Sequence, residues 1–437
     1  MKQKKKLILI CILIFTITLT VNNCKNNHPH PRPNIVIIII DALRPDHLPC
    51  YNYHKNTAPF ICSLTKKGTL FTNAFSTSSW TAPSVASLFT SFYPFQHNLI
   101  TGLAAQKKLI EKNNRITITS LNNEIITLPE LLKKIGYQTF SVSANPNISE
   151  VMGLHQGFDN LIIPKGKAAN NITKFAIGLK KNIIPNKPYF LYIHFMDTHS
   201  PYKIKIPHYL ASNNAQDNHI NIYDLEINFV DKHIKKLFNE YKWNNNTLLI
   251  IAADHGEELY DHNKTGHGFS LYKEVIKIPL IIYYPTRIPQ NEKINYNASL
   301  LDIFPTITNI LNIKSTSTPS GKSLLPLILN KNKHNNTRYL FSHLKPPKYQ
   351  SKSEEIISVL YKDYHYIQYP KNKLLFDLSL DPNEKNNIIK HKNVLANSML
   401  LQYQIYLKKS IKYPPLYKTT SLNQEQIQLL KSLGYIK

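Results

Sequence analysis

The sequence predicts an α/β protein, built from a mostly parallel sheet flanked by helices and a smaller antiparallel subdomain. Two apolar segments carry most of this prediction. The first, Asn34–Ile40, is a run of branched residues that ends at Asp41, and the second, Thr247–Ala253, ends at Asp254. Unbroken apolar runs of this length are typical of strands that are buried on both faces, as in parallel sheets.

The body of the chain, residues 34–330, alternates between strand-like and helical patterns, as expected for parallel strands joined by helical crossovers. The predicted strands are Asn34–Asp41, Tyr137–Ala144, Tyr189–Met196, Thr247–Ala253 and Ile278–Tyr284, and the clearest helices are Leu128–Ile135 and Ile227–Glu240.

A polar stretch, Asn330–Asn336, separates the body from a smaller C-terminal subdomain, residues 337–437. Three short strands of an antiparallel sheet and one helix are predicted there: Ile356–Tyr361, Tyr364–Tyr369, Lys373–Leu378 and the helix Asn393–Leu407.

The N-terminus predicts export. A basic segment precedes Leu7–Val21, an apolar stretch shorter than the roughly 20 residues of a membrane span and typical of a signal peptide. The stretch ends near Cys24, which resembles the lipidated cysteine of a loose bacterial lipobox. We therefore expect a signal peptide (1–23), a lipid on Cys24 and a polar tether (24–33) that holds the protein on a membrane of the cell envelope. An uncleaved anchor and ordinary secretion are the alternatives.

Lys and Arg outnumber Asp and Glu by 53 to 27, which gives a net charge of +26. A solvated lysine surface explains this charge, and attraction to anionic lipid headgroups or polyanionic substrates is the alternative. No nucleic-acid-binding motif is present, so no nucleic-acid partner is expected. Cys50 and Cys62 are one candidate pair, and we expect two reduced thiols.

One helix start stands out in the sequence. Pro83 suits the first turn of a helix, because proline there loses no hydrogen bond. Thr81 then lies at or just before the helix N-terminus, where its hydroxyl faces unpaired N–H groups and the positive end of the helix dipole. Such a hydroxyl either caps the helix or does chemistry.

Parallel sheets bind ligands at the carboxyl ends of their strands. Asp41, Asp254 and His255 all follow predicted strands, so we expect them to meet Thr81 at one edge of the sheet. Two carboxylates, an imidazole and a hydroxyl suit one divalent metal, with manganese, zinc or magnesium favoured over calcium, which takes more oxygen ligands.

These segments, in this order, resemble the sulfatase family of the alkaline-phosphatase superfamily. The resemblance rests on Asn34–His47, Trp80–Ser84 and Asp254–Glu257. It continues through shorter motifs: Cys50–Tyr53, His194–Tyr202, Gly266–Gly268, Leu271–Glu274, Ile303–Thr306, Leu375–Leu378 and Leu433–Ile436. The resemblance implies an alkaline-phosphatase-like fold in which the C-terminal subdomain closes one side of the cleft.

The chain departs from that family at three positions. Where sulfatases carry a Cys or Ser that is oxidised to formylglycine, this chain has Thr81, and Val85 stands at the following arginine position. Ala42 replaces a second aspartate beside Asp41. Threonine cannot yield the aldehyde, so no formylglycine is expected, and Thr81 becomes the predicted nucleophile, activated by the metal and the helix N-terminus.

The resemblance assigns further roles. His199 and His267 match positions that contact the anionic substrate and protonate the leaving group. His262, Lys264 and Arg44 are candidate substrate contacts, although a structural salt bridge suits Arg44 equally well. His194 is expected to point into the sheet.

The leading hypothesis is an envelope enzyme that cleaves or transfers phosphate esters or phosphodiesters through a covalent intermediate on Thr81. One alternative is sulfuric ester hydrolysis, the activity of the family. Another is an inactive lipoprotein that uses the cleft for binding. Drift in an inert protein would remove the ligand set early, and that set is intact. Physiological substrate and oligomeric state are not predicted.

The lipid anchor gives a first prediction. Peptide mapping of the mature protein should find Cys24 at the N-terminus with an added acyl mass, because the anchor keeps a folded domain on a membrane surface. A different mature N-terminus, or an unmodified Cys24, would contradict the anchor.

Overall fold

A computed structural model describes residues 32–103, 115–207, 210–313, 318–330, 337–345, 355–421 and 424–432. The chain divides into a short unit, Met1–Pro33, and a main unit, Asn34–Lys437. The predicted signal peptide, Cys24 and most of the tether lie outside the described residues, as does the segment Leu433–Ile436. No helix in the described ranges is long and apolar enough to cross a membrane.

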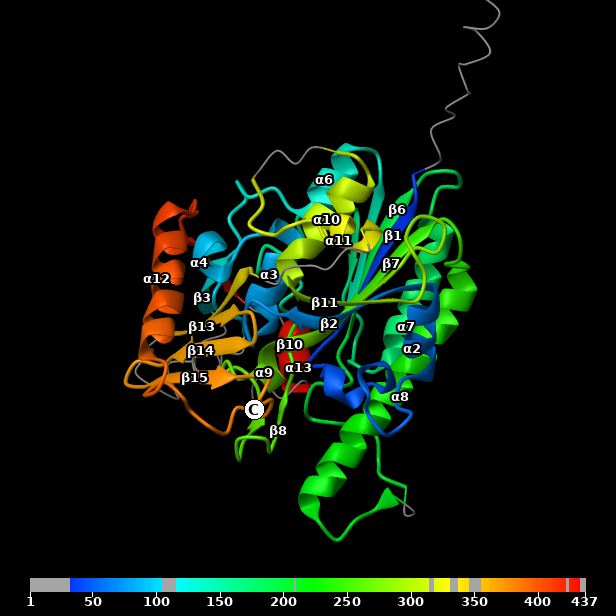
Figure 1. The fold of residues 1–437 in the computed structure, drawn as a ribbon. Coiled ribbons are helices and arrows are strands. Elements are labelled where there is room, and N and C mark those ends of the chain that lie inside the picture. Colours follow the sequence, from blue (N-terminus) through cyan, green and yellow to red (C-terminus); the bar gives the residue numbers. More distant parts are fainter. Residues whose placement is uncertain are drawn as a thin grey trace, which may run out of the picture. The chain divides into compact units, whose positions relative to one another are not determined.

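An eight-stranded sheet forms the centre of the main unit (Figure 1). From edge to edge its strands are β11 (Glu292–Ser299), β2 (Gly68–Phe75), β10 (Lys277–Tyr283), β7 (Thr247–Ala252), β1 (Asn34–Ile40), β6 (Tyr189–Phe195), β4 (Gln138–Ser143) and β5 (Asn160–Ile162). All neighbours are parallel except β10, which is antiparallel to β2 and β7. The predicted mostly parallel sheet is confirmed.

Strand β1 lies in the middle of the parallel part. Ile38 pairs with Ile193 of β6 on one side and Ile251 of β7 on the other. All of Ile35–Ile40 is at most 1% exposed. Six consecutive branched side chains therefore pack on both faces of the sheet, which is why the run contains no alternation of polar residues.

Helices cover both faces of the sheet. Figure 1 shows α2 (Pro59–Leu64), α7 (Ala169–Gly178) and α8 (Ala215–Tyr241) on one face and α3 (Thr81–Thr90), α6 (Leu128–Lys134), α10 (Ile303–Ile310) and α11 (Leu325–Leu329) on the other. Helix α6 matches its prediction and begins with a capping box between Thr127 and Glu130. The predicted Ile227–Glu240 is the second half of the longer α8.

The C-terminal region forms a four-stranded antiparallel sheet, β12 (Tyr339–Leu344), β13 (Ile356–Tyr361), β14 (Tyr364–Gln368) and β15 (Lys373–Asp377), with helix α12 (Asn393–Lys409) packed against it. The three predicted strands and the helix are present, and β12 was not predicted. A separate antiparallel pair, β3 (Arg115–Ser120) with β16 (Leu416–Ser421), joins segments that are far apart in sequence.

The remaining elements are short. They are α4 (Pro94–His97), α9 (Lys273–Ile276), α13 (Gln424–Ser432), the hairpin β8 (Glu258–Leu259) and β9 (Thr265–Gly266), and the 3₁₀ turns η1 (Pro45–His47), η2 (Pro49–Tyr51), η3 (Thr65–Lys67), η5 (Leu179–Asn182) and η7 (Leu300–Asp302).

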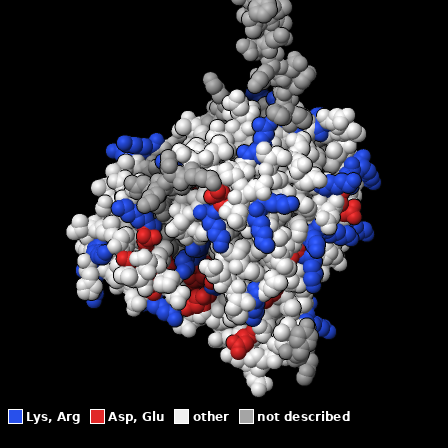
Figure 2. Space-filling model, turned by 45° about the vertical axis from the view of Figure 1, so that its right-hand side comes forward, with Lys and Arg blue, Asp and Glu red and all other residues white. Residues whose placement is uncertain are grey.

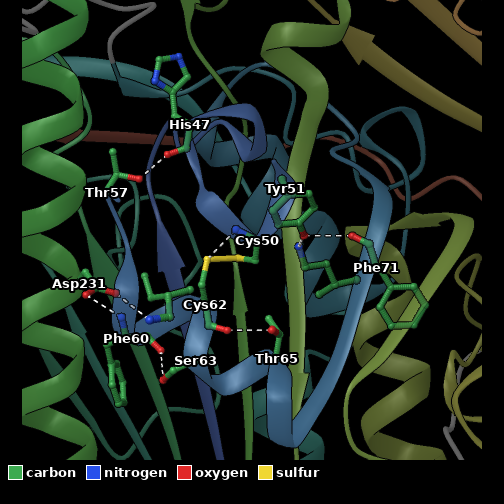
Figure 3. The surroundings of a disulfide bond; sticks show 12 residues. His47, Cys50, Tyr51, Thr57, Phe60, Cys62, Ser63, Thr65, Phe71 and Asp231 are labelled. Carbon is green, nitrogen blue, oxygen red and sulfur yellow. Dashed lines mark hydrogen bonds between the residues drawn. A yellow bond between two sulfur atoms is a disulfide. The ribbon is translucent and has the colours of Figure 1, made fainter. Parts of the chain in front are cut away.

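Cys50 and Cys62 form a disulfide (Figure 3). The expectation of two reduced thiols was wrong. The turn η2 and helix α2 bring the two Cα atoms to 5.3 Å, within the range that a disulfide requires. That approach depends on how the chain folds back between the two cysteines, which their spacing alone does not show.

His97 is an imidazole buried in α4. The N–H of Leu99 donates to Nδ1 over 3.1 Å, so Nε2–H donates to Ser87 Oγ, also over 3.1 Å. A proton on Nδ1 would displace the bond from Leu99. Burial lowers the pKa of His97 to about 3.

This folded-state pKa lies below the unfolded value of about 6.5, so the stability from neutral His97 is complete above that pH and is lost as the pH falls, by up to about 1.4 kcal/mol per pH unit. His97→Gln cannot take up this proton. We expect the variant to lose less stability than the wild type between about pH 7 and pH 5 in urea unfolding. His391→Gln, at an exposed position, is the control. Equal pH sensitivity of H97Q and the wild type would contradict this account.

Candidate active site

Three strand ends and one helix start meet at one edge of the sheet. Asp41 follows β1, Asn145 follows β4, and Asp254 and His255 follow β7. Because these strands are parallel, their carboxyl ends lie at the same edge. Thr81 is the first residue of α3, and the N-cap is Trp80. The structure therefore brings together all four predicted metal-site residues.

The Thr81 hydroxyl points into this group. Its Oγ1 lies 3.4 Å from Asp41 Oδ2 and 3.4 Å from His255 Nε2. Asn145 Nδ2 donates to Asp41 Oδ2 over 2.9 Å and to Thr81 Oγ1 over 3.3 Å. Trp80 occupies the cap and Thr81 faces side chains, so a capping role for Thr81 is not supported. The prediction missed Asn145, whose only sequence signal is its place after a predicted strand.

Two carboxylates are buried side by side in the site. Asp41 and Asp254 are at most 1% exposed. Asp41 Oδ1 and Asp254 Oδ2 are buried without a hydrogen-bond partner among the described residues. Burial opposes ionisation of Asp41, but its hydrogen bond with His194 holds its pKa well below the usual range. Burial and the Asp41 charge raise the pKa of Asp254. Unpartnered buried oxygens on neighbouring acids fit a bound cation.

His255 presents a lone pair to these acids. Its Nδ1 lies 2.8 Å from the Gly256 carbonyl, which can only accept, so Nδ1 carries the proton. In the neutral ring Nε2 is then unprotonated, 3.5 Å from Asp41 Oδ1 and 3.6 Å from Asp254 Oδ2. A lone pair facing two carboxylate oxygens is unfavourable unless a cation lies between them. The donor set of Asp41, Asp254 and His255 therefore fits a divalent metal.

His194 does not point into the sheet, and that expectation was wrong. Its Nε2 lies 3.2 Å from Asp41 Oδ2 and 3.9 Å from Asp254 Oδ2. The ligand atoms of Asp41, His194 and Asp254 all lie within 4.8 Å of one another. Tyr192 OH lies 2.8 Å from His194 Nδ1. When Tyr192 OH donates to Nδ1, the proton of His194 lies on Nε2 and is donated to Asp41 Oδ2. His194 then orients the Asp41 carboxylate without binding the metal itself.

Two further histidines lie beside the metal-site residues. The ring of His267 is 4.2 Å from that of His255 and 4.9 Å from that of His199, centroid to centroid. His267 Nδ1 lies 3.0 Å from Glu257 Oε2. Burial alone would lower the pKa of His267, but the Glu257 carboxylate raises it to about 9. Burial lowers the pKa of His199 to about 4. At neutral pH one imidazole is thus a proton donor and the other is neutral.

Buried Lys167 was also missed by the prediction. Its Nζ donates to the backbone carbonyl of His199. The side chain is 2% exposed, and burial lowers its pKa to about 8. Lys167 lies between predicted elements, and no sequence signal pointed to it.

Apart from His199 and His267, none of the predicted substrate contacts lies in this group. Arg44 pairs with Asp46 over 2.7 Å and with Asp261, and it donates to the Glu257 carbonyl over 3.2 Å. Arg44 therefore supports the residue that holds His267.

His262 makes its contacts away from the active-site group. Its Nδ1 lies 2.5 Å from Glu274 Oε1, its Nε2 lies 3.3 Å from the Glu384 carbonyl, and its ring stacks on Tyr272. Lys264 is exposed on the β8–β9 hairpin.

Comparison with known proteins identifies the family. Residues 33–313 match the sulfatase family, and residues 266–410 match the C-terminal domain of N-sulphoglucosamine sulphohydrolase. The first match covers more than half of the chain, so this chain belongs to the sulfatase family.

Relatives span most of the chain at low identity. An N-acetylgalactosamine-6-O-sulfatase of Bacteroides thetaiotaomicron is 22% identical over 81% of this chain and 89% of its own length. Arylsulfatase K of Xenopus laevis is 24% identical over 76% of this chain and 74% of its own.

Solved structures confirm the alkaline-phosphatase-like fold. A protein in complex with its substrate D-glucosamine-2-N,6-O-disulfate superposes with a TM-score of 0.70 at 19% identity, over 87% of this chain and 99% of that chain. The phosphonate monoester hydrolase of Agrobacterium radiobacter also gives 0.70, at 16% identity, over 90% and 100%. The family match makes the chain a sulfatase-family hydrolase, and the names of its relatives favour the sulfate-ester alternative over the expected phosphoester chemistry.

The donor set predicts roughly one equivalent of divalent metal in the purified chain, measured by elemental analysis. Asp254→Ala should lose it, because the remaining carboxylate and imidazole leave the site incomplete. His194→Gln should weaken metal affinity by about 10- to 100-fold without abolishing binding, as expected for an outer partner. Asp217→Ala, at an exposed position on α8, is the matched control. Full metal content in Asp254→Ala would overturn the ligand assignment.

Proposed function

We propose that this chain hydrolyses esters of a tetrahedral oxyanion at the site around Thr81, with sulfate esters as the first candidate class. The observation that carries the proposal is the Thr81 hydroxyl at the N-terminus of α3, within 3.4 Å of Asp41 and of His255. Membership of the sulfatase family and the relatives' names favour sulfate.

Asp41, Asp254 and His255 would hold the metal, with the Thr81 hydroxyl beside it. That metal would supply Lewis-acid stabilisation of the negative charge that develops in the reaction. The N-terminal N–H groups of α3 add positive potential at the same place.

The protein side chains then divide the proton transfers. Thr81 Oγ1 loses its proton to solvent and attacks sulfur or phosphorus. The bond from the central atom to the alcohol oxygen breaks, and His267, cationic because of Glu257, protonates the departing alcohol. Water then attacks the central atom and gives a proton to His267, which is neutral after protonating the alcohol. The bond to Thr81 breaks, and Thr81 Oγ1 takes a proton from solvent.

Phosphate esters are the second candidate class, and the specific observation in their favour is the threonine itself. A formylglycine diol releases sulfate by elimination through its second hydroxyl. Thr81 has one oxygen on Cβ, so that route is closed and water must attack the central atom. Such an attack is ordinary for phosphorus, and on this route transfer to an acceptor alcohol begins with the same covalent step.

We also infer export to the cell envelope, with attachment through a lipid on Cys24. The Cys50–Cys62 disulfide supports export, because disulfides persist in oxidising compartments. The face drawn in Figure 2 carries many more basic than acidic side chains, which suits an anionic membrane surface or an anionic substrate.

The test is the steady-state rate on matched nitrophenyl sulfate and nitrophenyl phosphodiester. Thr81→Ala should lower the favoured activity by about a thousandfold or more, as expected for a nucleophile. Thr81→Ser keeps the hydroxyl and is the matched control. Faster sulfate release supports the first candidate, and faster phosphodiester release supports the second. Full turnover by Thr81→Ala, on either substrate, would contradict the role of Thr81.

A further inference from the structure

A pocket of about 510 Å³ is lined by residues outside the active-site group. Its wall comes from turns η1 and η2, strands β2 and β11, and the segment from α9 to the start of β10. Three lysines line it: Lys273, Lys277 and Lys293. They lie on three consecutive elements: Lys273 on α9, Lys277 at the start of β10 and Lys293 on β11.

Two acidic side chains also line the pocket, but each pairs with an arginine or a histidine that does not line it. Asp46 Oδ2 pairs with Arg44 over 2.7 Å. Glu274 Oε1 lies 2.5 Å from His262 Nδ1. Both carboxylates therefore have a partner outside the pocket. Neither forms an ion pair with a pocket lysine in the described ranges.

Lys277 is the most constrained of the three lysines. Within the described part of the chain no hydrogen bond or ion pair joins its Nζ, although the side chain is half-buried at the start of β10. Burial and the neighbouring Lys273 charge lower the pKa of Lys277 to about 8, although the Asp46 carboxylate opposes this shift. A half-buried ammonium beside another ammonium favours a bound anion.

Hydrogen bonds and a disulfide connect the elements that form the pocket wall. Tyr51 OH donates to the Phe71 carbonyl over 3.0 Å and accepts from Leu280 N–H over 2.9 Å, which ties turn η2 to β2 and β10. The Cys50–Cys62 disulfide ties the same turn to α2 (Figure 3). Amide side chains of Asn52, Asn73 and Asn295 add hydrogen-bonding groups.

We infer that this pocket is an accessory anion site that holds one sulfate or phosphate group between Lys277 and Lys293. A tetrahedral oxyanion matches these two ammonium groups and the nearby amide donors, and Lys273, whose Nζ donates to the Pro382 carbonyl, adds positive charge to the wall. The group is either a free ion or one substituent of a larger polyanion. The inference does not depend on ester hydrolysis at Thr81.

Lys277 itself is the reporter in the test. At about pH 8 a large fraction of this amine is neutral and reacts with an acylating reagent such as N-hydroxysuccinimidyl acetate. A bound anion stabilises the ammonium form and raises the pKa, so labelling should slow by about fivefold or more when inorganic sulfate or phosphate is added. Peptide mass spectrometry of the full chain measures the rate at Lys277. Exposed Lys371, outside the pocket, is the internal control.

Variants separate this site from the active site. Lys293→Gln, at an exposed position, should weaken the protection of Lys277, whereas Lys371→Gln should not. Thr81→Ala should keep the protection even where ester turnover is lost. Equal protection by inorganic sulfate and a sulfated oligosaccharide, at equal sulfate concentration, identifies a free ion, and stronger protection by the oligosaccharide identifies a group on a larger molecule. Unchanged labelling with every anion, or undiminished protection in Lys293→Gln, would overturn the site.

Discussion

Two buried carboxylates repel each other at the centre of the active site. Asp41 and Asp254 are both removed from water, and each leaves one oxygen unpartnered among the described residues. Such an arrangement is costly unless positive charge lies between the acids. The unprotonated Nε2 of His255 faces the same space. A divalent cation between these groups would offset the two negative charges and accept the lone pair of His255.

The parallel sheet keeps these groups together. Strand β1 is held between β6 and β7, and its branched side chains fill both faces without exposed surface. The strands therefore cannot slide without losing core packing. Asp41, His194 and Asp254 lie at the ends of these three strands. The rigidity of an apolar core thus fixes the positions of the polar site.

A second layer of charge controls the protonation of the site. Glu257 holds His267 in its cationic form, and Arg44 holds the Glu257 carbonyl while pairing with two other acids. His262, in the same loop as His267, is fixed by Glu274 and by the Glu384 carbonyl. The C-terminal region therefore contributes to the site by restraining this loop, in addition to packing its own sheet against α12.

Local sequence patterns were enough to predict the α/β architecture, the strands that flank the site and the meeting of Asp41, Thr81, Asp254 and His255. Those features follow from local patterns: apolar runs mark buried strands, and parallel strands share a carboxyl edge. The tertiary structure alone decided the pairing of Cys50 with Cys62, the turn of His194 toward Asp41 and the burial of Lys167. The same holds for the contacts of His262, which lie outside the site, and for the long-range pairing of β3 with β16. Each of these depends on which distant groups a side chain meets, and that information lies in packing rather than in the order of neighbouring residues.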